Sequence, residues 1–247
     1  MLILIISKSM IKIKDLYQKF KEKVVLNGVS LEINKGEIHF IIGMSGTGKT
    51  VLVKHIVGLL KPVKGKVVFE DKEVAALKEN ELKELRKKIT YVFQHSTLFD
   101  NLTLYENINL PIIKNKLKTA PDKYIKLVNI EKYKNSYPYE VGESIKKRAA
   151  IARGLAMNPD YIIYDEPTTG LSFSEARNID NLIFEMSRKL NITAIVISHD
   201  LYSIMSIADK ITMLHNGRII LTGTKEDFKK SDIDTVKQFI NSYSADL

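Results

Sequence analysis

A glycine-rich loop near the start of the chain has the residue types and the spacing that bind phosphate groups. It fits the pattern GxxxxGKT and reads, in order, Gly43, Met44, Ser45, Gly46, Thr47, Gly48, Lys49 and Thr50. The glycines allow backbone N–H groups to turn toward an anion, and a helix after the loop adds the positive end of its dipole. Lys49 supplies a cation for the outer phosphates, and the Thr50 hydroxyl is a ligand for Mg²⁺. The loop therefore predicts a nucleoside triphosphate site.

Two carboxylates, Asp165 and Glu166, follow the apolar run of residues 161–164. We predict that Asp165 holds Mg²⁺ directly or through water. Glu166 is predicted to orient and deprotonate the water that attacks the γ-phosphate. Taken by itself, a carboxylate pair after a strand is more often a solvated turn. Because the same chain carries an intact phosphate loop, the catalytic interpretation is favoured.

The elements that must position these residues alternate between strands and helices. Strands are expected over residues 11–15, 24–33, 37–42, 66–70, 161–164 and 192–198, and helices over 51–60 and 174–190. Residues 73–158 are expected to be mostly helical and polar, with a capping box from Thr103 to Glu106. Asn216-Gly217, between two apolar runs, indicates a β-hairpin. The alternation predicts an α/β fold in which helices cover a parallel sheet.

Composition limits the functional classes. The 247 residues include no cysteine, which excludes disulfides, thiolate metal sites and cysteine nucleophiles. The net charge of +9 predicts an acidic partner, either nucleic acid or an anionic membrane surface. Residues 1–6 are apolar but far too few to span a membrane or to form a secretory signal. We therefore expect a cytosolic protein that is long enough to bury a substantial core.

Three further residues fall where ABC-transporter ATPases place functional side chains, and over roughly residues 11–222 the chain resembles one ATP-binding domain of that family. Phe20 matches the aromatic residue against adenine, Gln94 the glutamine that joins Mg²⁺ and water to the permease contact, and His199 the histidine at the γ-phosphate. Taken alone, Phe20 could equally be a buried structural phenylalanine, Gln94 would be a solvent-exposed loop glutamine, and His199 would be a structural histidine at a strand end. The resemblance implies ATP and Mg²⁺ as ligands. It also implies an ABC-type P-loop NTPase fold with a parallel core sheet, an N-terminal antiparallel β-subdomain and an inserted helical subdomain.

The resemblance implies a division of the chain. Residues 1–10 would form an apolar N-terminal extension, either a frayed segment or an artefact of the start codon. Residues 11–224 would form the ATPase domain, with a helical subdomain over about residues 95–160. Residues 225–247 would form a C-terminal extension of one or two short helices.

Residues 43–65 and 93–111, and the C-terminal segment 223–239, are similar to the ATPases of the Mla and Mce lipid-transport systems. This likeness implies that ATP hydrolysis drives phospholipid transport between the inner membrane and the outer envelope, in a direction that the sequence leaves open. It implies an integral membrane permease, a second ABC ATPase subunit and an Mce-type lipid-binding protein as partners. The chain would then lie peripherally on the cytoplasmic face of the bacterial inner membrane.

A soluble ABC ATPase that acts on nucleic acid or on an assembly scaffold is the alternative suggested by the positive charge. The basic residues are scattered through the middle of the chain and its C-terminal tail, without the interleaved aromatic residues of single-strand binders. We therefore expect no nucleic-acid partner. A catalytically inactive regulatory subunit is disfavoured because Glu166 and His199 are both present.

The chain departs from the family at the signature, the segment that each subunit offers to the ATP of its partner. In the LSGGQ-like segment of residues 141–145, Gly142 replaces the serine, Glu143 replaces the first glycine, and Ser144 follows. A signature offers a helix N-terminus and a serine hydroxyl to the γ-phosphate. The Glu143 carboxylate suits the helix dipole but repels phosphate, so Glu143→Gly is expected to raise ATPase activity. Alternatively, Glu143 is only a favourable first-turn acid.

Ser172 stands where the family usually has an aspartate that couples the two nucleotide sites of a dimer. With Glu175 it forms an SxxE capping box for the next helix, so only the structural part of that role is kept. Both departures affect what the chain gives to a partner subunit rather than its own nucleotide. Two assemblies follow: a homodimer with two weakened sites, which we favour, or a heterodimer with a subunit that carries an intact signature.

Overall fold

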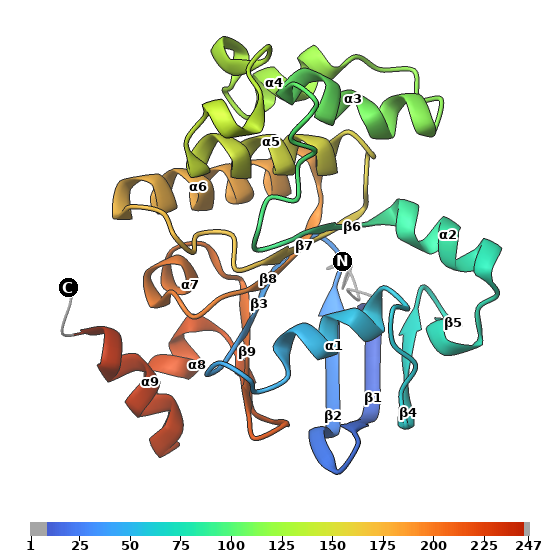
Figure 1. Ribbon diagram of the computed structural model, residues 1–247. Coiled ribbons are helices and arrows are strands. Elements are labelled where there is room, and N and C mark those ends of the chain that lie inside the picture. The colour runs from blue at the N-terminus through green and yellow to red at the C-terminus, as the bar shows by residue number, and fades with distance from the viewer. Residues whose placement is uncertain (1–8, 245–247) are drawn as a thin grey trace, which may run out of the picture. The chain divides into compact units, whose positions relative to one another are not determined.

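The computed structural model describes residues 9–244, which form two compact units (Figure 1). The first unit contains the described residues up to Leu85 together with those from Ile197 onward, and the second contains Arg86–Val196. Most of the expected extension over residues 1–10 lies outside the described residues, and Ser9 already begins the first strand. The helical subdomain expected over about residues 95–160 falls within the second unit, and its bounds stay a prediction.

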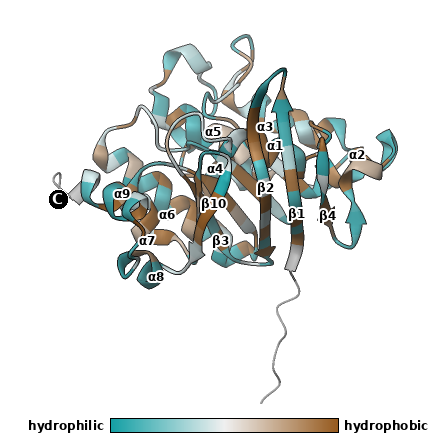
Figure 2. Ribbon diagram, turned by 90° about the horizontal axis from the view of Figure 1, so that it is seen from below, coloured by the Kyte–Doolittle hydropathy of each residue, from teal (hydrophilic) through white to brown (hydrophobic). Residues whose placement is uncertain are grey.

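An antiparallel sheet in the first unit contains β1 (Ser9–Phe20), β2 (Lys23–Asn34), β4 (Lys64–Phe69) and β5 (Lys72–Glu73), in the order β2-β1-β4-β5. β1 and β2 mix apolar and polar residues (Figure 2), and their apolar side chains, such as Leu16 and Val29, are buried. β1 continues beyond the expected end at Asp15, which has a φ of +49°. The register of β1 and β2 shifts there, between Ile13 and Leu16. Such a bulge absorbs the irregularity and lets strand pairing continue.

The strands β10, β9 and β3 of the first unit lie side by side in that order. β3 (Ile38–Ile42) is buried and parallel to β9 (Lys210–His215), which pairs antiparallel with β10 (Arg218–Gly223). The predicted hairpin is confirmed: Asn216 and Gly217 both have positive φ, as the tightest hairpin turns require. The pairing with β9 holds the end of β3, where the phosphate loop begins.

The helices of the first unit include α1 (Lys49–Ile56), α7 (Leu201–Ile207), α8 (Lys225–Lys229) and α9 (Asp234–Ser244). α8 and α9 are the short C-terminal helices that the sequence predicts. α1 ends before the expected residue 60, because Gly58 adopts a φ of +66°. The His55 ring then bonds the Leu60 carbonyl, with 3.0 Å between Nδ1 and the oxygen. α2 (Glu79–Lys88) leads from the first unit into the second.

A chain of hydrogen-bonded polar side chains runs from Glu37, just before β3, across β3 and β9 to β10. The His39 ring is fully buried, and its Nδ1 lies 2.8 Å from a Glu37 carboxylate oxygen. Its Nε2 lies 2.8 Å from Thr212 Oγ1, which is 3.0 Å from Thr222 Oγ1. Burial raises the pKa of Glu37, but bonds from His39 and Asn34 and the charge of His39 outweigh it, so the pKa lies below its usual value. A satisfied polar chain of this kind specifies one pairing of the strands.

We expect Glu37→Gln to lower the free energy of unfolding by about 1–2 kcal/mol at neutral pH, because it replaces a charge-assisted hydrogen bond with a neutral one. The pKa of Glu37 in the folded protein lies below the usual value of a glutamate carboxyl in an unfolded chain. The contribution of Glu37 to the free energy of unfolding is therefore complete above that value. It is lost as the pH falls through the pKa of the folded protein. Denaturant unfolding at about pH 7 and about pH 3 measures this. Equal differences between wild type and variant at both pH values would contradict it.

The second unit contains β8 (Thr193–Ile197) except for its last residue, and β7 (Tyr161–Asp165) and β6 (Ile89–Val92), side by side in that order. Its helices include α3 (Leu104–Lys114), α4 (Pro121–Leu127), α5 (Glu143–Leu155) and α6 (Phe173–Leu190). β6 and β7 are parallel, with Tyr91 opposite Ile163. The sequence interpretation missed β6 because this short run lies between polar helical segments, although its β-branched and aromatic residues favour a strand.

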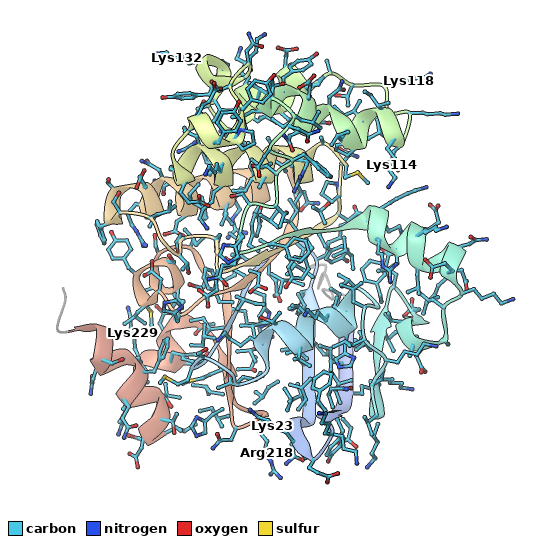
Figure 3. All side chains as sticks on the ribbon, in the orientation of Figure 1. Lys23, Lys114, Lys118, Lys132, Arg218 and Lys229 are labelled. Carbon is cyan, nitrogen blue, oxygen red and sulfur yellow. The ribbon has the colours of Figure 1, made fainter. Side chains whose placement is uncertain are left out.

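The helices α3, α4 and α5 pack against one another as a helical lobe (Figure 1). α3 begins with the predicted capping box: Thr103 Oγ1 accepts from the Glu106 N–H at 3.2 Å, and the Glu106 carboxylate accepts from the Thr103 N–H at 2.8 Å. Figure 3 shows Lys114, Lys118 and Lys132 extending from this lobe. Part of the positive charge of the chain is therefore displayed here.

Candidate functional site

The phosphate loop joins β3 to α1 within the first unit. Gly43 and Gly48 have φ values of 145° and 103°, which glycine adopts most readily. A Cβ at Gly43 would collide with the carbonyl oxygen of Leu214, and one at Gly48 would lie 2.9 Å from the carbonyl oxygen of Val25. The loop is thus packed so closely that these two positions require glycine. This close approach of backbone is what a phosphate-binding loop needs.

Lys49 begins α1, and its ammonium group folds back over the loop. The side chain is only 8% exposed, and Nζ donates to the carbonyl oxygens of Gly43 at 2.7 Å and Met44 at 3.1 Å. Thr50, beside it, is half-buried. Among the described residues, no side chain caps the helix at Gly48 and no acidic residue occupies its first turn. Ammonium and helix N-terminus therefore give this loop a positive field, which fits a triphosphate.

A cavity of about 480 Å³ lies beside the phosphate loop. It is lined by loop residues 44–47, by residues 23–25 of β2 and by residues 215–217 at the β9–β10 turn. Figure 3 shows Lys23 and Arg218 at the tips of these two hairpins. Phe20, the last residue of β1, is paired with Lys23 and is 45% exposed. It is therefore not the buried structural phenylalanine of the alternative interpretation, and stacking on adenine remains its predicted role.

His199 lies in the first unit, between β8 and α7, and its side chain is exposed. The next residue fixes the turn: the Asp200 carboxylate accepts from the backbone N–H groups of Tyr202 at 2.9 Å and Ser203 at 3.2 Å. An aspartate that caps a helix in this way holds the preceding backbone in one conformation. The role of His199 at the γ-phosphate stays a prediction.

In the second unit, Asp165 ends the buried strand β7 and Glu166 follows it. Asp165 is 9% exposed, and its Oδ2 accepts a hydrogen bond of 2.6 Å from the Tyr91 hydroxyl. Glu166 has a φ of +50°, a costly conformation for a residue with a side chain. Its carboxylate accepts from Thr169 Oγ1 at 3.3 Å. Backbone strain of this kind concentrates at functional sites, which agrees with the predicted catalytic role of Glu166.

Tyr91 is a residue that the sequence interpretation did not single out. Burial raises the pKa of its hydroxyl far above the usual value, and the hydrogen bond and charge of Asp165 raise it further. The hydroxyl is therefore protonated at physiological pH, which is the form that donates to Asp165. Its ring stacks on Phe93, with 4.4 Å between the ring centroids. Recognition of residues 89–92 as a strand parallel to β7 would have revealed this pair.

We expect Tyr91→Phe to weaken the apparent affinity for Mg²⁺ about tenfold, because partners that orient a metal ligand typically contribute this much. The change leaves the ring in place but removes the donor to Asp165. Titration of Mn²⁺ followed by electron paramagnetic resonance, at saturating ATP, measures the affinity directly. ATP binding in the presence of EDTA is the control and should match wild type. Unchanged or tighter Mn²⁺ binding in the variant would exclude this role for Tyr91.

The three predicted metal ligands have the chemistry that Mg²⁺ prefers. Thr50, Gln94 and Asp165 offer a hydroxyl, an amide oxygen and a carboxylate, which are hard oxygen ligands. In the part of the chain that the structure describes, no cluster of three or more acidic or histidine side chains forms a cation cage. Mg²⁺ bound to nucleotide needs only one or two carboxylates besides phosphates and water, so the residues present fit this ion.

The altered signature lies at the start of α5. Gly142 is the N-cap residue, and a Cβ there would meet no atom within 4 Å, so the structure has room for the family's serine. Glu143 is in the first turn, where its carboxylate lies 3.7 Å from Lys146 Nζ and 3.4 Å from Ser96 Oγ. Ser144 is half-buried. The position of Glu143 agrees with its predicted favourable interaction with the helix dipole.

The predicted capping box of Ser172 is confirmed. Its N–H and Oγ both donate to a Glu175 carboxylate oxygen, at 3.0 Å and 2.6 Å. These bonds from the Ser172 hydroxyl and N–H lower the pKa of Glu175 below its usual value. Ser172 therefore starts α6 as an aspartate would, but it supplies no negative charge.

A family model described as "ABC transporter" matches residues 26–169 of the chain. The methionine import ATP-binding protein MetN of Clostridioides difficile is 34% identical over 240 residues, which cover 95% of this chain and 75% of MetN. The intermembrane phospholipid transport system ATP-binding protein MlaF of Haemophilus influenzae is 32% identical over 244 residues, which cover 96% of this chain and 92% of MlaF.

Solved structures also resemble this chain. The cbiO1 protein of Clostridium perfringens, part of the ABC transporter complex cbiONQ, has a TM-score of 0.82 and 29% identity, over 97% of this chain and 96% of its own. The dimeric ATP-binding cassette MJ0796, bound to ADP and Pi, has a TM-score of 0.77 and 30% identity, over 87% of this chain and 98% of its own. These likenesses confirm the fold class that the sequence predicts.

Proposed function

The chain belongs to the ABC transporter ATP-binding family, and from that membership we propose that it is the ATPase subunit of a phospholipid transporter. As a member of this family, it binds ATP with Mg²⁺ and hydrolyses it, and its class pairs with membrane permeases and forms dimers. One observation supports the nucleotide function best: the Lys49 ammonium folds over a glycine loop that ends in an uncapped, acid-free helix N-terminus.

The residues of the first unit have binding roles in the proposed mechanism. Lys49 exchanges the carbonyl oxygens of Gly43 and Met44 for oxygens of the outer phosphates, with no change of fold. The backbone N–H groups of the loop and the N-terminus of α1 surround the same phosphates. Phe20 stacks on adenine, and His199 contacts the γ-phosphate. Together these groups fix the triphosphate in line for attack by water.

The residues of the second unit act on water and on the metal. Glu166 accepts a proton from the attacking water as the water oxygen bonds to the γ-phosphorus, and the bond from that phosphorus to the bridging oxygen of ADP breaks. Asp165 and Gln94 of this unit, and Thr50 of the first, are the residues that would hold Mg²⁺. The chemistry that this ion supplies when bound is neutralisation of phosphate charge. Tyr91 keeps the Asp165 carboxylate in one orientation.

Two likenesses support phospholipid as the cargo. MlaF of Haemophilus influenzae is by name the ATP-binding protein of an intermembrane phospholipid transport system, and it aligns with 96% of this chain. Residues 43–65 and 93–111 are similar to the Mla and Mce ATPases as segments, beyond the nucleotide motifs. We therefore propose the cytoplasmic face of the inner membrane as its location, with a permease and an Mce-type lipid-binding protein as partners. Within residues 9–244, no helix has both the length and the apolar character needed to cross a bilayer.

Methionine import is the second candidate. MetN proteins of Clostridioides difficile and Carboxydothermus hydrogenoformans are 34% and 36% identical to this chain, a similarity no lower than that of MlaF. The nucleotide motifs serve either cargo equally, because ATP hydrolysis is the same reaction in both. The cargo therefore has to be identified through the permease.

The test is to purify the intact complex through an affinity tag on this chain, after extraction with detergent. We expect a hydrophobic permease and bound phospholipid to copurify, and ATPase activity of the reconstituted complex to respond to phospholipid. Stimulation by methionine, together with a methionine-binding subunit in the complex, would replace the lipid proposal with the second candidate. Copurification of nucleic acid without a permease would contradict both.

A further inference from the structure

A buried lysine, Lys147, lies one turn into α5 and has no role in the mechanism above. Its side chain is only 5% exposed, whereas lysine is almost never fully buried unless it is paired. Its Nζ donates to the backbone carbonyl oxygen of Gln94 at 3.1 Å. The ammonium group therefore fastens the loop that carries Gln94 to the signature helix. Both partners lie within the second unit.

The negative charges of two carboxylates favour the charged form of this buried ammonium group. Burial lowers the pKa of Lys147, and the negative charges of Glu143 and Glu166 oppose that fall. Glu143 stands four positions before Lys147 on the same helix, the spacing and order at which a carboxylate and an ammonium group on a helix attract best. Glu143 is also one of the departures from the family signature. The replacement therefore places a negative charge one helical turn before this buried cation.

Further contacts hold the same loop to α5. The Glu143 carboxylate accepts from Ser96 Oγ at 3.4 Å, a long contact. The Arg153 guanidinium donates to the carbonyl oxygens of Ser96 at 3.3 Å and Thr97 at 2.9 Å, and to Thr97 Oγ1 at 3.1 Å. Three side chains of α5 thus bond to residues 94–97. The Gln94 loop and the signature helix are joined as one body within this unit.

We infer that Glu143 is a positioning residue: as the counter-charge of Lys147, it holds the Gln94 loop on the signature helix. We call this arrangement of Glu143, Lys147 and the Gln94 carbonyl the latch. Its functional meaning rests on the proposed role of Gln94. An acid that served only the helix dipole would act on the end of α5 and would leave the Gln94 loop unchanged. A carboxylate that only repelled the partner's phosphate would give higher ATPase activity on removal. The latch predicts a looser loop instead.

The absence of cysteine from the sequence allows a direct measurement of loop mobility. His95, an exposed residue between Gln94 and Ser96, is replaced by cysteine and labelled with a nitroxide, whose spectrum separates mobile from immobile populations. We expect the mobile fraction to rise about tenfold in Glu143→Gln and in Lys147→Gln, as expected for the loss of one charge-assisted hydrogen bond. The double variant should be no more mobile than Lys147→Gln alone, because both changes break the same link.

Lys146→Gln is the matched control. It removes one positive charge from the same turn of α5 and one exposed contact of Glu143, but not the bond to the Gln94 carbonyl. The spectrum of the nitroxide should then match that of the unaltered background. An unchanged spectrum in Glu143→Gln, or additive effects in the double variant, would overturn the latch. Thermal unfolding of each variant shows whether it is folded. If Lys147→Gln fails to fold, the test still rests on Glu143→Gln, because Glu143 lies at a partly exposed position.

The spectrum is recorded without nucleotide, so its outcome is independent of ATPase activity. A mobile loop in Glu143→Gln with no hydrolysis by the unlabelled wild-type chain would support the latch and contradict the proposed function. Hydrolysis by the wild-type chain, together with an unchanged loop in Glu143→Gln, would support the proposed function and contradict the latch.

Discussion

Lys49→Ala is expected to reduce ATP hydrolysis by about 10²–10³-fold or more, the cost of removing one charged donor from a site where negative charge develops. The ammonium group is held over the loop by two carbonyl oxygens, so in wild type it is already in place when the triphosphate arrives. The variant loses both this charge and the preorganisation. Calorimetric titration with ATP and Mg²⁺ should show weakened binding, and phosphate release should fall to background.

Lys54→Ala is the control for this prediction. It removes a lysine from the last turn of the same helix, α1, five positions after Lys49. Binding and hydrolysis should stay close to wild type. Because Lys49 is buried, thermal unfolding must show that Lys49→Ala is folded before its activity is interpreted. A folded Lys49→Ala variant that hydrolyses ATP at the wild-type rate would exclude this loop as the nucleotide site.

Glu166→Gln is expected to reduce hydrolysis by about 10²–10⁴-fold, the usual contribution of a general base, without weakening ATP binding. Glutamine has nearly the same shape, and it can still accept from Thr169 Oγ1, but it cannot take the proton from water. ATP should therefore accumulate on the protein. Binding of radiolabelled ATP, measured beside phosphate release, distinguishes this outcome from a simple loss of affinity.

Glu185→Gln, on the exposed side of α6, provides the matched neutralisation of a glutamate outside the site. It should hydrolyse ATP at the wild-type rate. Loss of ATP binding in Glu166→Gln would show that Glu166 acts mainly through the nucleotide or the fold. Retained hydrolysis would mean that another group accepts the proton.

Local signals in the sequence were enough to predict several parts of the site. The phosphate loop is a contiguous motif, and its glycines, Lys49 and Thr50 lie where the strand-to-helix transition was expected. The capping boxes at Thr103 and Ser172 and the hairpin at residues 216–217 also depend on neighbours three or fewer residues apart. Such features are fixed by short-range hydrogen bonds and by allowed φ values, so a single sequence reveals them.

The contacts that the sequence did not reveal join residues that are distant in the chain. Tyr91 and Asp165 are 74 positions apart, and Lys147 and Gln94 are 53 apart. Each pair depends on an element bringing two segments together: the pairing of β6 with β7 in one case, and the packing of α5 on the loop after β6 in the other. Because the short strand β6 was not recognised, neither contact could be predicted.

The signature shows a second limit of sequence reasoning. Comparison with the family pattern identifies Glu143 as a departure and predicts that its carboxylate repels the phosphate of the partner's nucleotide. The structure adds a buried cation, Lys147, whose charge this carboxylate supports. The room around Gly142 shows that steric crowding did not force the change of the family's serine. The two interpretations of Glu143 predict different effects of its removal: higher ATPase activity if it only repels phosphate, and a more mobile Gln94 loop if it supports Lys147.

The central claim is that this chain carries its own catalytic machinery for ATP, in Lys49, Asp165 and Glu166. The direct measurement is phosphate release by the purified chain with ATP and Mg²⁺, beside Glu166→Gln, over a range of protein concentrations. We predict release that is absent in the variant and that rises more steeply than the protein concentration, because the favoured homodimer completes each site. The claim would be contradicted if, at every protein concentration, the wild-type chain released no more phosphate than Glu166→Gln.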